Sequence, residues 1–147
     1  MTFRILVMGL PGAGKTTLAE KLRLQLESVG ARVVSLNADQ VRKEYDDWDF
    51  SHEGRIRQSR RMRELADKID SNYAICDFIA PLVEMREIFD ADYVIWVDTI
   101  DKGRFDDTNK VFVPPSIYDC RVNEQDAEKW SKYIAAHILK TQNNLPT

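Results

Sequence analysis

Cysteine is scarce in this sequence: Cys76 and Cys120 are the only two among its 147 residues. Two cysteines are too few for a disulfide framework, and their scarcity favours a reducing compartment, so we expect a cytoplasmic protein. Because the chain also has only 2 histidines, we predict no structural zinc site. The first residues lead straight into a strand-like run, so no signal peptide is expected.

Long apolar runs and an excess of one charge are also missing. No apolar run approaches the ~18 residues that a membrane span needs, so we expect no membrane partner. The 21 basic and 24 acidic side chains leave a net charge of −3, which excludes a basic coat over the whole surface but not a local basic pocket. What remains, 44% hydrophobic and 31% charged residues, is typical of a single globular domain spanning 1–147.

Hydrophobic periodicity divides the chain into alternating strands and helices. Short apolar runs predict strands at 3–8, 32–36, 73–76 and 93–97. Helical spacing predicts helices at 15–29, 51–71, 82–89 and 123–140, with a short helix after Asp39. We expect Asp39, Ser51 and Asn123 to cap helices. Residues 98–117 lack periodicity and are interpreted as a lid-like loop. This order predicts an α/β fold in which helices cover both faces of a mostly parallel sheet.

One motif predicts a specific chemistry. Residues 9–16, Gly-Leu-Pro-Gly-Ala-Gly-Lys-Thr, match the phosphate-loop pattern G-x-x-x-x-G-K-[ST] between a predicted strand and a predicted helix. In such a loop the backbone N–H groups and the positive end of the helix hold phosphate oxygens. Lys15 is the expected catalytic lysine at the β- and γ-phosphates of ATP, and the Thr16 hydroxyl is expected to bind Mg²⁺. The predicted ATP-binding residues are Gly12, Ala13, Gly14, Lys15, Thr16 and Thr17. The alternative is a glycine-rich turn with an idle lysine.

The rest of the sequence narrows the kind of P-loop protein. A GTPase carries an N-K-x-D guanine motif, and the nearest string, Asn-Lys-Val-Phe at 109–112, lacks the aspartate. Motor and transporter ATPases place an Asp-Glu pair after a hydrophobic strand, whereas the strands here end in Asp77-Phe78 and Asp98-Thr99. The pattern therefore favours a small-molecule kinase with the three-layer P-loop NTPase-type sandwich.

Several blocks between residues 3 and 122 resemble the adenylyl-sulfate (APS) kinase family, which phosphorylates the 3′-hydroxyl of adenosine 5′-phosphosulfate. After the phosphate loop, residues 36–42, Leu-Asn-Ala-Asp-Gln-Val-Arg, resemble the family's Leu-Asp-Gly-Asp-Asn-x-Arg. Asn37 replaces the first family acid and Asp39 keeps the second. A carboxylate there can accept the proton of the substrate hydroxyl or orient Mg²⁺ through water, and Arg42 is expected to contact the substrate's sulfate or phosphate. The alternatives are a helix cap for Asp39 and a surface charge for Arg42.

Two further blocks extend the resemblance. Residues 48–61, Trp-Asp-Phe-Ser-x-x-Gly-Arg-x-x-Gln-x-Arg-Arg, are similar to the family's segment in which a phenylalanine stacks on the substrate adenine. The match implies that Phe50 stacks there and that Arg55 and Gln58 bind the substrate, while most other arginines of this helix have solvated-surface roles. Residues 77–81, Asp-Phe-Ile-Ala-Pro, resemble the family's Ser-Phe-Ile-Ser-Pro and add Ile79 to the implied substrate site, although a core role is equally open.

The last block lies beside the lid. Residues 110–113, Lys-Val-Phe-Val, resemble the family's Lys-Gly-Phe-Thr, which implies substrate contacts for Lys110 and a second adenine-stacking ring at Phe112. A loop anchor is the alternative for both. About ten residues of the family's lid are missing by comparison, so Lys102, Arg104 and Lys110 are the expected sources of lid charge.

The leading hypothesis is an ATP- and Mg²⁺-dependent kinase that phosphorylates APS, with Asp39 positioning or deprotonating the hydroxyl. The family implies a homodimer. A related kinase acting on a nucleoside, nucleotide or polynucleotide hydroxyl is the first alternative. A nucleotide-binding protein without catalysis is the second, and the net acidity and the Lys15-Thr16 pair disfavour it and a nucleic-acid partner.

Overall fold

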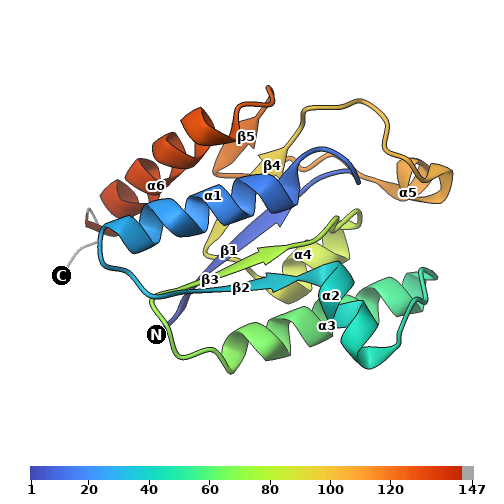
Figure 1. Cartoon of the computed structure of the whole chain (residues 1–147). Coiled ribbons are helices and arrows are strands. Elements are labelled where there is room, and N and C mark those ends of the chain that lie inside the picture. The colour runs from blue at the N-terminus through green and yellow to red at the C-terminus, as the bar shows by residue number, and fades with distance from the viewer. Residues whose placement is uncertain (144–147) are drawn as a thin grey trace.

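The computed structural model describes residues 1–143 and is built on one parallel β-sheet (Figure 1). Its 5 strands lie in the order β2-β3-β1-β4-β5, and every neighbouring pair is parallel. The strands are β1 (Phe3–Met8), β2 (Val33–Asn37), β3 (Tyr73–Asp77), β4 (Tyr93–Val97) and β5 (Cys120–Val122). The predicted fold class is confirmed, and β5 is a strand that was not predicted.

Within the described residues, six helices connect and follow these strands. They are α1 (Lys15–Ser28), α2 (Ala38–Tyr45), α3 (His52–Asp67), α4 (Val83–Phe89), α5 (Asp106–Val111) and α6 (Ala127–Asn143). The interpretation of 98–117 as a loop is wrong at α5, a turn and a half of helix inside that segment. It is too short to show an apolar period, and Thr108 is its single buried residue.

Three predicted helix ends are also wrong. The cap of α2 is Asn37, whose side-chain oxygen accepts from Gln40 N at 3.0 Å, so Asp39 lies within the first turn instead. The last helix begins at Ala127 rather than at 123, because Asp126 Oδ1 accepts from Lys129 N at 3.2 Å. Helix α3 ends at Asp67, before the predicted 71, whereas its predicted cap Ser51 is confirmed.

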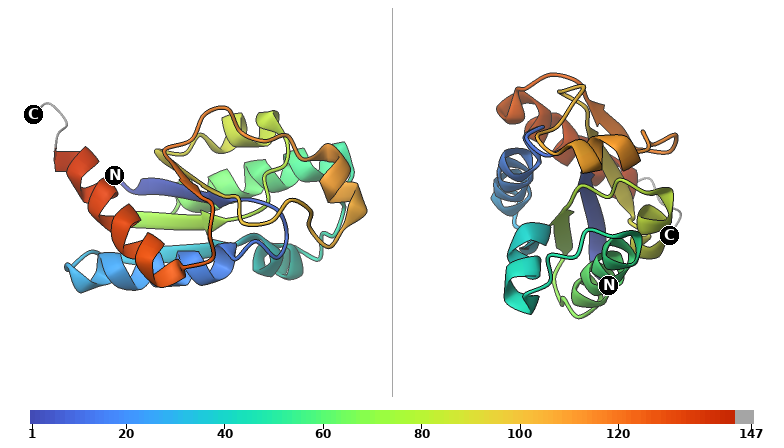
Figure 2. Two further views of the ribbon diagram at one scale, coloured as in Figure 1. Left: turned by 90° about the horizontal axis from the view of Figure 1, so that it is seen from above. Right: turned by 90° about the vertical axis from the view of Figure 1, so that its right-hand side faces the viewer.

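The two faces of the sheet have separate hydrophobic cores. Side chains of β1 alternate between them: Ile5 and Val7 pack under α1 and α6, and Leu6 and Met8 pack against α2, α3 and α4. Figure 2 shows α1 and α6 together on one side of the sheet and α3 and α4 on the other. These four residues of β1 are 0% exposed, which explains why the sequence of this central strand has an unbroken apolar run.

The parallel arrangement brings the carboxyl ends of all strands to one edge of the sheet. The phosphate loop follows β1, Asn37 ends β2, Asp77 ends β3 and the segment bearing α5 follows β4. This is the edge at which open α/β sheets bind ligands. Among the helices of the described residues, none is long and apolar enough to cross a lipid bilayer.

Candidate active site

The phosphate loop is held tightly between β1 and the first turn of α1. A side chain at Gly9, where φ is 150°, would place its Cβ 2.4 Å from the carbonyl oxygen of Val97, so only glycine fits there. Gly14 has a φ of 100° immediately before Lys15, the first residue of α1. Thr99 Oγ1 donates to the carbonyl of Ala13 at 2.6 Å and fixes the loop from the β4 side. The loop and the positive end of α1 therefore form a rigid anion site.

Lys15 lies over this loop. Its Nζ donates to the carbonyl of Leu10 at 3.0 Å. Burial lowers the pKa of Lys15 from 10.5 to about 8, although the charges of Asp77 and Asp39 act in the opposite direction. The ammonium group is thus poorly compensated by the protein itself, and a polyphosphate bound in the loop would stabilise its charged form.

Three oxygen-bearing side chains meet beside the loop. Asn37 Nδ2 donates to Asp77 Oδ1 at 2.8 Å and lies 3.4 Å from Thr16 Oγ1. Asp77 is 5% exposed, and burial raises the pKa of its carboxyl group, against hydrogen bonds from Thr16 and Asn37 and the charge of Lys15. Asp39 is exposed on the wall of the same cavity. Asp77 was not predicted as a site residue.

A cavity of about 460 Å³ opens from the phosphate loop along this edge of the sheet. Arg42 and Arg55, 4% and 5% exposed, form its far wall together with Phe50. The guanidinium carbon of Arg42 lies 4.3 Å from the centre of the Phe50 ring, and Arg55 Nε donates to the carbonyl of Phe50 at 2.9 Å. Burial lowers the pKa of both arginines. Gln58 also lines the wall and donates to the carbonyl of Ala38 at 3.1 Å.

These two arginines have no carboxylate of their own. Arg42 donates to the backbone carbonyls of Asp47 and Asp49 at 2.9 and 3.3 Å. Within residues 1–143, neither Arg42 nor Arg55 is in a salt bridge. Two buried guanidinium groups in one wall without an acidic partner create a strong local preference for an anion.

The opposite wall comes from the β3–α4 turn and the lid. Phe78, Ile79 and Ala80 line it on one side, and Arg104 and Phe105 line it from the segment before α5. Phe105 is 57% exposed. It was not predicted, and its only sequence signal was an aromatic residue next to the basic Arg104.

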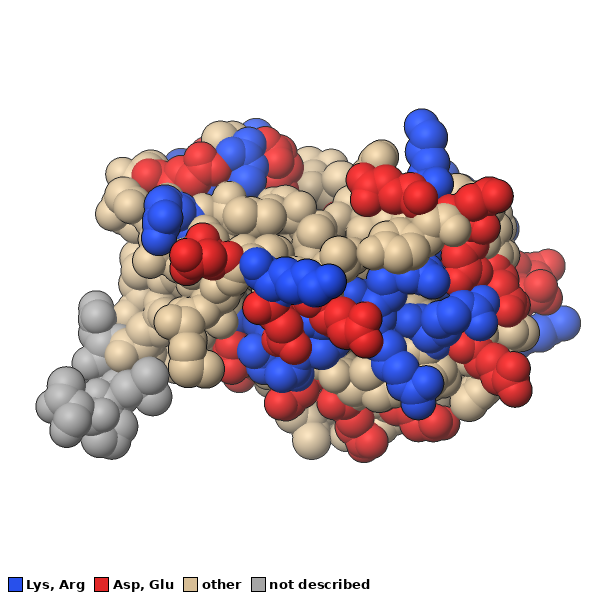
Figure 3. Space-filling view, turned by 90° about the horizontal axis from the view of Figure 1, so that it is seen from below, with Lys and Arg blue, Asp and Glu red and all other residues tan. Residues whose placement is uncertain are grey.

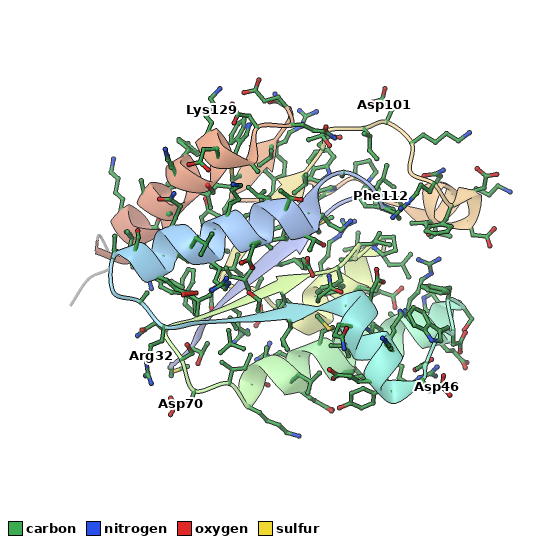
Figure 4. All side chains as sticks on the ribbon, in the orientation of Figure 1. Arg32, Asp46, Asp70, Asp101, Phe112 and Lys129 are labelled. Carbon is green, nitrogen blue, oxygen red and sulfur yellow. The ribbon has the colours of Figure 1, made fainter. Side chains whose placement is uncertain are left out.

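Two predicted substrate residues do not line this cavity. Phe112 follows the last residue of α5 (Figure 4) and packs against the hydrophobic core that α2, α3 and α4 cover. The guanidinium carbon of Arg86 lies 5.7 Å from the centre of its ring. Lys110 is exposed on α5. Arg86 donates to the carbonyl of Ala80 at 2.8 Å and so braces the turn that carries Ala80. The rings that share the cavity with Phe50 are therefore Phe78, which is buried, and Phe105, which is exposed on the lid.

A second cavity, of about 230 Å³, lies on the other side of the phosphate loop. Gly14 and Thr17 line both cavities. The remaining wall of the smaller one comes from the ends of β4 and β5 and from the loop before α6. It was not predicted, because it is formed by β5 and the loop before α6, which have no motif.

The arginine-rich helix α3 is largely neutralised by acidic neighbours. Arg57 and Arg61 both pair with Asp47, at 2.8 and 3.0 Å, and these bonds hold the pKa of that carboxyl group well below its usual range. Arg63 pairs with Asp67 at 2.9 Å. Figure 3 shows basic and acidic side chains interspersed on this face. Such a surface lacks the uncompensated basic stripe that nucleic-acid binding uses.

Known proteins share this architecture. A probable adenylyl-sulfate kinase of Archaeoglobus fulgidus is 40% identical over 90 residues, 59% of this chain and 58% of that protein. A structure of APS kinase from Mycobacterium tuberculosis in complex with AMPPNP and APS has a TM-score of 0.76 at 19% identity, covering 95% of this chain and 98% of that one. Shikimate kinase of Acinetobacter baumannii, in complex with shikimate, has a TM-score of 0.63 at 17% identity, covering 99% and 97%. The two structures establish the P-loop kinase fold.

The matches to curated proteins are partial. The chain spans about half the length of these relatives, since the aligned segments cover 58%, 51% and 45% of three probable adenylyl-sulfate kinases. The model of the adenylylsulphate kinase family, by contrast, matches residues 1–123 and so includes the phosphate loop, both cavity walls and the lid. The chain therefore belongs to the adenylylsulphate kinase family.

Proposed function

We propose that this protein is an ATP-dependent kinase that transfers the γ-phosphate of ATP to the 3′-hydroxyl of adenosine 5′-phosphosulfate. The observation that carries this proposal is the larger cavity, which joins the phosphate loop at one end to two buried arginines and an aromatic ring at the other. A kinase whose acceptor is itself a nucleotide needs two phosphate-bearing molecules to meet in this way. Family membership supports the choice of acceptor.

The nucleotide side follows from the phosphate loop. The backbone N–H groups and Lys15 would hold the β- and γ-phosphates, and the smaller cavity is the available space for the base of ATP. Thr16 and Asp77 bring a hydroxyl and a carboxylate to the same place, and oxygen donors of this kind suit Mg²⁺ held mainly by phosphates. A bound Mg²⁺ would neutralise charge on the transferred group.

The acceptor side fits an adenine nucleotide with a second anion. Phe50 and Phe105 line the same cavity, and one ring stacked on a base contributes about 1–3 kcal/mol. Arg42 and Arg55 would receive the phosphosulfate group. Asp39 can accept the hydroxyl proton, and Arg104 adds positive charge from the lid as the phosphoryl group moves. Positioning and electrostatics supply most of the catalysis in such transfers.

The direct test incubates the purified protein with Mg-ATP and APS and measures the phosphorylated product. Phe50→Ala should raise KM for APS about 5- to 150-fold, the equivalent of one stacking contact. Trp48→Ala is the matched control, because Trp48 is exposed to a similar degree in the same loop, 51% against 47% for Phe50, but does not line the cavity. Tight ATP binding without phosphorylated APS would refute the acceptor.

The resemblance implies a lid about ten residues shorter than the family's, and this favours one second candidate, a related kinase with a different acceptor hydroxyl. Labelled ATP with a panel of nucleosides, nucleotides and polynucleotide ends distinguishes the two, since transfer to one of these and not to APS selects the alternative.

Family membership also supports two proposals about assembly and location. The protein would form a homodimer, and it would be found in the cytoplasm. Sedimentation equilibrium of the purified protein tests the first, and fractionation of cells that express it tests the second. A monomer at micromolar concentration would contradict the dimer.

A further inference from the structure

The last residue pair of the β2–β3 ladder is Asn37 and Asp77. The two residues are register partners in the parallel ladder, and their side chains are joined by the 2.8 Å bond from Asn37 Nδ2 to Asp77 Oδ1. Asn37 Nδ2 also lies 3.4 Å from the hydroxyl of Thr16, the residue that follows the phosphate-loop lysine. A carboxylate, an amide and a hydroxyl thus converge where the nucleotide's phosphates would lie.

The orientation of the Asn37 amide is set by the fold. Its Oδ1 accepts from Gln40 N at 3.0 Å as the cap of α2, so the NH₂ group must face Asp77 and Thr16. An aspartate at this position could still cap the helix, but it would place a second carboxylate against Asp77. Two carboxylates this close do not both ionise, so only one of positions 37 and 77 can hold a charged carboxylate.

The acid of the pair lies on the β3 side. Asp77 is 5% exposed and, within residues 1–143, is in no salt bridge at 4.0 Å or less. A buried carboxylate with so few partners lowers stability unless a cation joins it, and an asparagine or serine would fill the position without this cost. Carboxylate and hydroxyl oxygens are the ligands of hard divalent cations.

We propose that Asp77 supplies the carboxylate that positions the divalent cation of the bound nucleotide, together with Thr16. Asn37 is its neutral, hydrogen-bonding partner, and Asp39 remains free to act on the acceptor hydroxyl. By the resemblance given above, Asn37 corresponds to the first family acid and Asp77 to a family serine. Relative to that pattern, the carboxylate of this residue pair is on β3 instead of β2. The inference rests on the proposed function only in needing nucleotide binding at the phosphate loop.

Calorimetric binding of AMPPNP, a nucleotide analogue that is not turned over, tests the proposal without any activity measurement. The measured quantity is the ratio of affinities with Mg²⁺ and with EDTA. Asp77→Asn should reduce this ratio by about 10- to 100-fold, the effect of losing one oriented group at a metal site. The double exchange Asn37→Asp with Asp77→Asn returns one carboxylate to the pair and should recover most of the ratio.

Asp39→Asn is the matched control, since it removes a carboxylate from the same cavity and should leave the ratio unchanged. These exchanges are close to isosteric, and thermal unfolding checks that each variant is folded. A wild-type ratio in Asp77→Asn would overturn the proposal, and so would a ratio lost in Asp39→Asn instead. A wild-type protein that shows the metal effect but does not phosphorylate APS would refute only the proposed acceptor.

Discussion

The affinity for nucleotide should fall as the pH rises through the pKa of Lys15. Burial lowers this pKa from 10.5 to about 8 in the protein without nucleotide. A bound triphosphate surrounds the ammonium group with negative charge and raises the pKa again, so binding captures a proton whenever the pH lies above about 8. Below that pH the lysine is already charged and the affinity is independent of this group.

The size of the effect follows from the protonated fraction of the free protein. At pH 9 about one tenth of Lys15 is charged, so the affinity should be about 10-fold weaker than at pH 7, a difference of about 1.4 kcal/mol. At pH 8.5 binding should take up about three quarters of a proton, because that fraction of Lys15 is uncharged before binding.

Titration calorimetry of AMPPNP from pH 7 to pH 9.5, in buffers of different ionisation enthalpy, measures both quantities. Lys15→Arg is the control, since guanidinium stays charged throughout and should give a flat profile at whatever affinity it retains. A flat wild-type profile without proton uptake would show that the lysine is not desolvated, which would refute the reasoning from its burial.

Four other substitutions test the fold and the lid. Gly9→Ala should lower the free energy of unfolding by several kcal/mol, measured by denaturant titration, because its Cβ would meet a backbone oxygen 2.4 Å away. Asn109→Ala should raise KM for both substrates with little loss of stability, since its amide joins both backbone groups of Gly103 at 2.7 and 3.0 Å and so holds the lid. Phe105→Ala should raise KM for APS more than Phe112→Ala does, because Phe105 lines the cavity and Phe112 does not. The reverse order in steady-state assays would show that Phe112, and not Phe105, contacts the acceptor base.

The strands and helices that could be predicted are those with a clear apolar pattern. Strands β1, β3 and β4 have apolar runs that are largely buried under helices, and α1, α3 and α6 have apolar stripes. Strand β2 has a short apolar run, although none of its residues is fully buried. Strand β5 has 3 residues, of which Arg121 is exposed, so alternation cannot distinguish it from a loop. Its strand conformation comes from pairing with β4, a contact that one sequence does not specify.

The residues of the candidate site also divide into those that the sequence could predict and those that it could not. The phosphate loop is a contiguous motif with its own physics, and Arg42, Phe50, Arg55 and Gln58 lie on one cavity as the family resemblance implied. Phe112 does not, because α5 turns its end toward the core. Asp77 escaped prediction because its significance depends on the register of β3 beside β2, and strand register is a property of the folded sheet.

The resemblance implies a lid shorter than the family's, so in the proposed function fewer residues would have to enclose the two substrates. Gly103 lies so close to the phosphate loop that a Cβ there would come within 3.0 Å of Pro11. The lid therefore contacts the loop that would bind the nucleotide's phosphates. The next two residues, Arg104 and Phe105, then turn toward the acceptor cavity. A charge for the transferred phosphoryl group and a ring for the acceptor base thus come from consecutive positions. In the proposed function, residues beyond α5 would then not be needed to close the site, and Phe112 packs against the core instead.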